Sequence, residues 1–294
     1  MAADRLDAQH GPARRPALDG ILASLHFYRA NAQLWLTEPE EAIDSFRRAV
    51  ALSLNEGNTD WPRYIEPLNN LGWLLKTQGR YDEAISELNR IRFGCTERVV
   101  HEACSTAWFN LADAHQEAGR HADAVEGFEE AARRVTASQH APPRLLAAIH
   151  QGLALSLVAL AQERALEARE PLLARASDAW QQAEAARREA GIEDESFRMT
   201  RGRILIARRD WPAAIALLTS LDVSGEDRVI REGLLAGIHS CLGDAKRSQD
   251  HMEHAMTMQF EGRDARLFHV MRDFQRIVDG CAPEARGGED IHAS

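Results

Sequence analysis

Apolar residues in most of this chain recur at the three- to four-residue spacing of an amphipathic helix. In the stretch LNNLGWLLKTQGRYDEAISEL, residues 68–88, two such runs are separated at Gly79. A glycine at this point can adopt the left-handed conformation that ends a helix. Asp82 and Glu83 follow in the first turn of the second run, where the helix dipole favours acidic side chains. The pattern predicts two antiparallel helices joined by a tight turn.

The same pattern recurs along the chain. Residues 108–135 align with the first stretch at an offset of 40 residues, so that Gly72 corresponds to Ala112. Both residues are small because two paired helices must approach closely there. Further units are predicted at 38–50, which forms the second half of an earlier hairpin, at 144–190 with elongated helices, at 201–221 and at 233–256; an amphipathic helix follows at 263–280.

These units resemble the tetratricopeptide repeat over roughly residues 20 to 260. The forms LNNLG and FNLA, with steps near 40 residues, are most similar to the kinesin-light-chain and regulatory-receptor branches. The resemblance implies an all-α fold: an α-solenoid of about six helical hairpins in a right-handed superhelix. A C-terminal capping helix at 263–280 would cover the apolar face of the last repeat.

The expected solenoid spans residues 17–280. The segments 1–16 and 281–294 are polar and contain proline or glycine, so we expect both to be disordered. The loop at 136–143 is the clearest internal break. It is a candidate hinge, and a continuous solenoid is the alternative.

The resemblance also implies where a partner binds. In this family the first helix of each hairpin lines the concave groove, so its outward residues contact the ligand. These residues lie two or three positions before the small residue and one, four or five positions after it. The predicted peptide-binding residues are Asn69, Asn70, Trp73, Lys76, Phe109, Asn110, Asp113, Ile149, His150, Leu153 and Arg203, with Phe27 contributed by the first unit.

Asn70 and Asn110 occupy equivalent positions in successive units. A side-chain amide can donate to and accept from a peptide bond at once, so the pair could hold an extended peptide. The alternative is that the asparagines bridge helices within the protein. Trp73 and Phe109 could likewise pack between neighbouring hairpins. Few lysines are available, which disfavours the carboxylate clamp of chaperone-binding relatives.

Charge and composition exclude several classes of function. The net charge is −10 with no block of like charges, which argues against a nucleic-acid partner. The apolar segment 145–161 is broken by two polar residues and is short for a membrane span, so we expect no membrane contact. Four cysteines in a chain of 294 residues do not indicate a disulfide framework, and a reducing cytoplasm is the simplest location.

No metal or cofactor site is expected. Cys95, His101 and Cys104 lack a fourth zinc ligand nearby in sequence. His251 and His254 are close to three methionines, but the repeat register already explains most of that stretch. No nucleotide-binding glycine loop and no spacing typical of a catalytic triad is found.

These observations predict a protein–protein interaction module that binds an extended peptide or partner segment in its concave groove, as an adaptor or scaffold. One alternative is a regulatory receptor that senses a small peptide or metabolite. The other is an enzyme built on the helical scaffold, although we expect no enzymatic activity. Its candidate residues are His101, His115, His150, His239 and Cys104. The sequence favours no particular oligomeric state.

Overall fold

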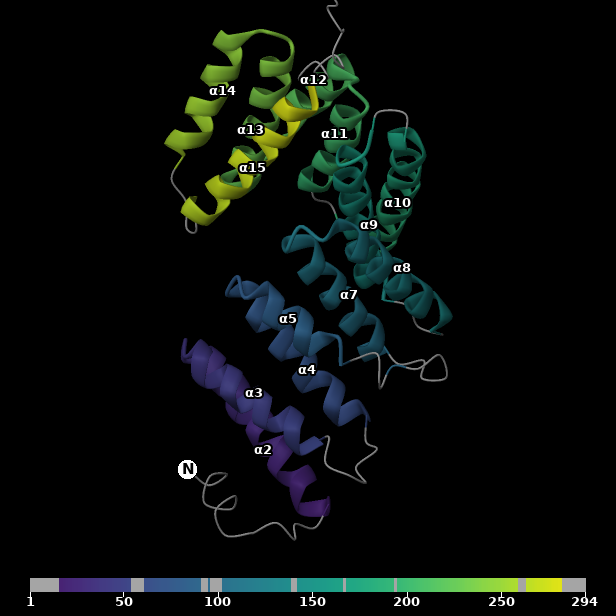
Figure 1. Ribbon diagram of the computed structural model, residues 1–294, viewed down its shortest axis with the longest axis vertical. Helices are drawn as coiled ribbons and strands as arrows, with labels where there is room; N and C mark the ends of the chain where they lie inside the picture. Colours follow the sequence, from purple (N-terminus) through teal and green to yellow (C-terminus); the bar gives the residue numbers. More distant parts are fainter. Residues whose placement is uncertain are drawn as a thin grey trace, which may run out of the picture. The chain divides into compact units, whose positions relative to one another are not determined.

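The computed structural model describes residues 16–53, 61–90, 95, 102–138, 142–165, 168–192, 195–258 and 263–281 (Figure 1). Every regular element in these ranges is helical, which confirms the all-α prediction. The predicted disordered ends, 1–16 and 281–294, lie outside the described residues except for one residue each.

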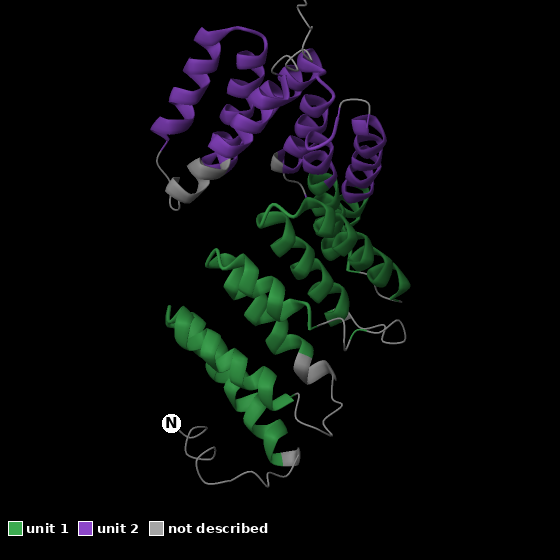
Figure 2. Ribbon diagram, in the orientation of Figure 1, with its two compact units in different colours: residues 1–156, 185–190 green, residues 157–184, 191–294 purple. Residues whose placement is uncertain are grey.

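Two compact units divide the chain (Figure 2). Unit 1 comprises residues 1–156 and 185–190, and unit 2 comprises residues 157–184 and 191–294. The division therefore falls within two helices, and the hinge at 136–143 stays a prediction. The helices that begin in unit 1 are α2 (Pro16–Trp35), α3 (Pro39–Ser53), α4 (Trp61–Thr77), α5 (Tyr81–Leu88), α7 (Glu102–Glu117), α8 (His121–Ala137) and α9 (Pro143–Gln162). The later helices are α10 (Arg169–Glu189), the short 3-10 helix η2 (Glu195–Phe197), α11 (Arg198–Ala207), α12 (Trp211–Ser220), α13 (Gly225–Cys241), α14 (Ala245–Thr257) and α15 (Arg263–Cys281).

Consecutive helices pack as hairpins. In unit 1 the pairs are α2 with α3, α4 with α5, and α7 with α8; in unit 2 they are α11 with α12, and α13 with α14. Neighbouring hairpins stack, because α4 also contacts α3 and α7, and α13 also contacts α11 and α12. Each unit thus contains a solenoid-like stack of helical hairpins. The number of six hairpins and the right-handed superhelix stay predictions.

The hairpin turns share one backbone conformation. Gly79 and Gly119 have φ values of +72° and +75°, which confirms the left-handed conformation predicted for both. After each glycine, the backbone N–H of the next residue donates back into the first helix, as from Arg80 to Leu75 at 2.9 Å. Thr37 and Arg209 have φ values of +59° and +62° at the corresponding turns, where the sequence has no glycine.

Small residues lie at close helix contacts, and at Gly72 this contact is between the two helices of one hairpin, as predicted. A Cβ atom on Gly72 would be 2.4 Å from the Cγ atom of Leu88, so the two helices meet without room for a methyl group. A Cβ atom on Gly152 would be equally close, 2.4 Å, to the ring of Phe128 on the preceding hairpin. At both glycines the helices of unit 1 are packed too closely for a larger side chain.

By length and composition, α9 could cross a membrane, and it is the one helix of this kind among the described residues. Of the apolar 18-residue window in this helix, 61% is buried inside the protein. Buried core helices of soluble proteins can be equally long and apolar, so the length and composition of α9 are weak evidence for a membrane span.

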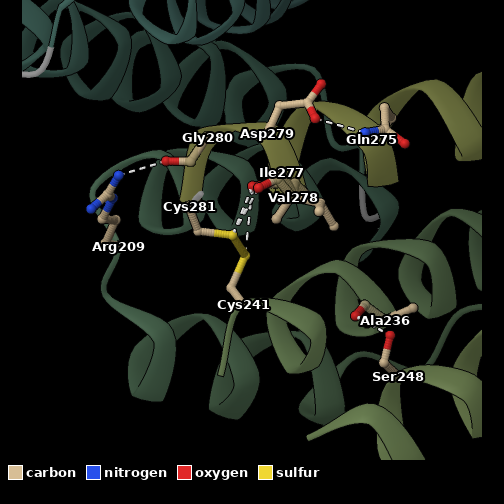
Figure 3. Close-up of a disulfide and its surroundings, with 10 residues drawn as sticks. All are labelled: Arg209, Ala236, Cys241, Ser248, Gln275, Ile277, Val278, Asp279, Gly280 and Cys281. Atoms are coloured by element: carbon tan, nitrogen blue, oxygen red, sulfur yellow. Dashed lines mark hydrogen bonds between the residues drawn. A yellow bond between two sulfur atoms is a disulfide. The ribbon is translucent and has the colours of Figure 1, made fainter. Parts of the chain in front are cut away.

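The expectation of unpaired cysteines is wrong. Cys95 is joined to Cys104, with a Cα–Cα distance of 5.6 Å. Cys241 is joined to Cys281, with a Cα–Cα distance of 5.7 Å (Figure 3). The second pair is 40 residues apart in sequence, and its members meet because α15 packs against α13. That contact depends on tertiary structure, so cysteine spacing gave no sign of it.

Candidate binding surface

The predicted asparagines connect successive first helices. The side-chain amide of Asn70 on α4 donates to Oδ1 of Asn31 on α2 at 3.4 Å. Asn110 on α7 donates to Oδ1 of Asn69 on α4 at 3.3 Å, and Asn69 donates to the carbonyl oxygen of Ala103 at 3.2 Å. The structure therefore gives the asparagines the bridging role that was the alternative prediction.

This bridging leaves part of each amide available. The Oδ1 atoms of Asn70 and Asn110 accept no hydrogen bond from the residues that the structure describes. Both side chains are partly exposed. The NH2 group of each side chain thus donates a hydrogen bond within the protein, while its Oδ1 atom can accept an N–H from a ligand.

Two further polar contacts continue along the same helices. Lys76 on α4 forms a short ion pair with Asp113 on α7. Ser156 on α9 donates to Oε1 of Gln116 on α7 at 2.8 Å. The charge of Lys76 is consequently compensated within the protein.

The two predicted aromatic residues differ in their surroundings. Trp73 is 47% exposed and lies on α4 one turn from both Asn70 and Lys76. Phe109 is partly buried, and its ring lies 5.9 Å from that of Phe128. Phe109 therefore packs toward its own hairpin, whereas Trp73 faces solvent. We call the following residues the first-helix face of unit 1: Asn31, Asn70, Trp73, Lys76, Asn110 and Asp113.

Other predicted residues do not share this accessibility. Ile149 is fully buried, and His150 and Leu153 are also buried. Burial lowers the pKa of His150. Assigning Ile149 to an open groove was incorrect, because α9 turns that side chain into the core. Arg203 belongs to unit 2, where it donates to Asp273 of α15 at 2.5 Å.

The structure describes four of the candidate catalytic residues, namely Cys104, His115, His150 and His239. Cys104 is in a disulfide, so it offers no thiol, and His101 lies outside the described residues. His115 is 3.7 Å from Asp123, whereas His239 stacks on the ring of His251. Across the described ranges, no group of three or more His, Cys, Asp or Glu could hold a metal ion.

Sequence reasoning missed one buried charge network in unit 2. Glu232 on α13 accepts from Arg231 at 2.6 Å, and its other oxygen lies 2.7 Å from Nδ1 of His251 on α14. Burial alone would raise the pKa of Glu232, but the hydrogen bonds with His251 and Arg231 lower it to about 2. The one available signal was a glutamate within the apolar run of α13. The network holds α14 against α13.

Sequence comparison agrees with this architecture. Residues 21–92 and residues 105–134 each match a family model described as the tetratricopeptide repeat. Residues 21–92 and 105–134 carry tetratricopeptide repeats. The first match covers α2 to α5, and the second covers most of α7 and α8. The first-helix face of unit 1 is therefore built by these repeats. Among curated proteins, none matches the sequence significantly.

Solved structures resemble the fold over most of the chain. BtubC (BKLC) from P. vanneervenii is 17% identical, with a TM-score of 0.53, over 87% of this chain and 98% of that one. The apo form of RapI is 10% identical, with a TM-score of 0.54, over 91% of each chain. A putative kinesin light chain with TPR-like repeats from Podosopora anserina is 17% identical, with a TM-score of 0.46, over 86% of this chain and 98% of that one. At these identities the likeness to BtubC and RapI concerns the fold alone.

Proposed function

We propose that this chain is a protein-interaction module and that the first-helix face of unit 1 binds an extended peptide or a segment of a partner protein. The exposure of Trp73 beside Asn70 and Lys76 carries this proposal. A large aromatic ring surrounded by polar groups is typical of the residues that dominate binding energy. In the proposed complex an apolar side chain of the partner packs on the Trp73 ring.

The amide oxygens of Asn70 and Asn110 support an extended ligand. They lie on successive first helices, α4 and α7, so one peptide could donate backbone N–H groups to both. The hydrogen bonds of Asn70 with Asn31 and of Asn110 with Asn69 hold the two side chains in place before binding. Such preorganisation lowers the entropic cost of binding.

Charge supports a protein partner over a nucleic acid. The net charge is −10, and Lys76 on this face is already paired with Asp113. Phosphate backbones require clustered, available Lys and Arg side chains. We propose that the module acts as an adaptor or scaffold with no catalytic role of its own.

A cytoplasmic location remains part of this proposal. The cytoplasm keeps most protein thiols reduced, and the disulfides that do form there are usually transient and catalytic or redox-sensing. The pairs Cys95–Cys104 and Cys241–Cys281 would therefore respond to redox conditions in that compartment.

The test is selection of peptides from a random displayed library on the full chain, followed by affinity measurement with labelled peptides. Trp73→Ala should weaken binding by about 30-fold, the loss expected for a hot-spot residue of about 2 kcal/mol. Met256→Ala is the matched control, because Met256 is an exposed apolar residue on a second helix, α14. Equal affinities for the Trp73→Ala chain and the unchanged chain, with both folded, would refute the proposal.

A further inference from the structure

The C-terminal helix α15 lies on the surface of unit 2 that corresponds to the first-helix face of unit 1. Gly202 on α11 and Ala236 on α13 are the small residues of their hairpins. In unit 1, Trp73 directly follows the small residue Gly72. The residues that directly follow Gly202 and Ala236 are Arg203 and Gly237, so these two lie on the equivalent face of unit 2. The positions three before and five after Ala236 are those of Gly233 and Cys241.

α15 contacts each of these four positions. A Cβ atom on Gly233 would be 2.3 Å from Val270, and one on Gly237 would be 3.0 Å from Ile277. Glycine within a helix reduces stability, so two glycines one turn apart on α13 need a reason. The close approach of α15 provides that reason.

Polar and covalent contacts complete the interface. Arg203 donates to Asp273 at 2.5 Å, and both side chains are mostly buried. Arg209 on the α11–α12 turn donates to the carbonyl oxygen of Gly280 at 2.5 Å. The disulfide Cys241–Cys281 joins the last residue of α13 to the last residue of α15 (Figure 3).

We propose that the face formed by α11 and α13 is a second binding surface, that its ligand is an amphipathic helix of a partner protein, and that α15 occupies it as a built-in competitor latched by Cys241–Cys281. This inference extends the proposed function, since it assumes that first-helix faces bind partners. The contacts of α15 define the ligand chemistry. It presents two β-branched apolar residues seven positions apart, like Val270 and Ile277, with an acidic residue between them, like Asp273.

Opening the latch requires a dithiol reductant. One thiolate of the reductant attacks a sulfur of the Cys241–Cys281 bond and forms a mixed disulfide, and the second thiol then displaces the protein sulfur. The protein gains two electrons and two protons as two thiols, and the reductant becomes a disulfide. α15 then keeps only its non-covalent contacts. Its effective concentration at the face falls with the loss of the covalent constraint, so a partner helix can compete.

The experiment measures binding of a labelled synthetic peptide of residues 263–281, with serine in place of Cys281, to the full chain. The oxidised chain should not bind this peptide, because α15 covers the face. The Cys241→Ser chain should bind it. A chain with Cys241→Ser and Arg203→Asp should instead prefer the peptide carrying Asp273→Arg, by at least about 10-fold, because the ion pair is then restored in reverse.

Several results would overturn the inference. One is equal binding of the two peptides by the charge-reversed chain, and a second is binding of neither peptide by chains that melt cooperatively. A third is binding of the unmodified peptide by the oxidised chain as tightly as by the Cys241→Ser chain. Should the charge-reversed chain fail to fold, hydrogen exchange on the unchanged chain decides. Reduction should accelerate exchange in 263–281 by about 10-fold or more, and unchanged rates would refute the latch. Trp73-dependent peptide binding involves unit 1 alone, so its failure and the failure of this inference are distinguishable.

Discussion

Gly72 and Leu88 touch so closely that a methyl group on the glycine would lie 2.4 Å from the Cγ atom of the leucine. Leu88 is completely buried, so its side chain has little space into which to move. Gly72→Ala should therefore lower the free energy of unfolding by about 1–3 kcal/mol, the usual cost of overpacking a core.

Urea denaturation measures this effect. Ser86→Ala, on the exposed side of α5, is the control and should change stability by less than about 0.5 kcal/mol. A Gly72→Ala chain as stable as the Ser86→Ala chain would show that the hairpin can relax around the extra methyl group.

The turn between α2 and α3 contains a strained residue. Thr37 has a φ of +59°, a conformation that disfavours a β-branched side chain, whereas Gly79 takes it at the next turn. Thr37→Gly should raise stability by about 0.5–1 kcal/mol, because relief of strain exceeds the added flexibility of the unfolded chain. Gly79→Thr should lower stability. Thermal unfolding of the two variants measures both signs, and a loss of stability in Thr37→Gly would contradict this account.

The hydrogen bond between Asn110 and Asn69 should contribute measurably to stability. A double-mutant cycle with Asn69→Ala and Asn110→Ala should give a coupling energy of about 0.5–1.5 kcal/mol, as expected for a partly buried hydrogen bond. Chemical denaturation of the four chains provides the measurement. Strict additivity would mean that the bridge between α4 and α7 does not stabilise the fold.

The lowered pKa of Glu232 predicts that unit 2 becomes less stable in acid. Its pKa is lowered from 4.5 to about 2 in the folded protein, where burial opposes ionisation but the bonds with His251 and Arg231 more than offset it. The folded state therefore binds a proton less readily than the unfolded state. The resulting stabilisation is complete above pH 4.5 and is lost as the pH falls toward 2.

Melting temperatures at pH 6 and pH 3 test this prediction. Glu232→Gln cannot ionise, so its melting temperature should fall less between the two values than that of the unchanged chain. Equal falls in the two proteins would show that other carboxyl groups govern the acid response.

Local signals in the sequence explain which features were predicted. Gly79 and Gly119 marked their turns because glycine favours positive φ, whereas Thr37 and Arg209 adopt the same turn without such a signal. The small residue Gly72 likewise revealed a close helix contact. Local signals of this kind were enough for the fold class.

Features that depend on tertiary contacts were not accessible in this way. The direction of Ile149 depends on how α9 packs, and the Cys241–Cys281 pair depends on where α15 lies. Asn70 has the same side chain whether it binds a ligand or Asn31, so its type left both interpretations open.

Site-specific photo-crosslinking tests the central claim most directly. A photoreactive phenylalanine analogue replaces Trp73 on the first-helix face in one chain and Ser86 on the outer helix α5 in another, within the native cell. We predict a crosslinked partner from position 73 and none from position 86. Crosslinks that form equally at both positions, or at position 86 alone, would contradict binding through the first-helix face.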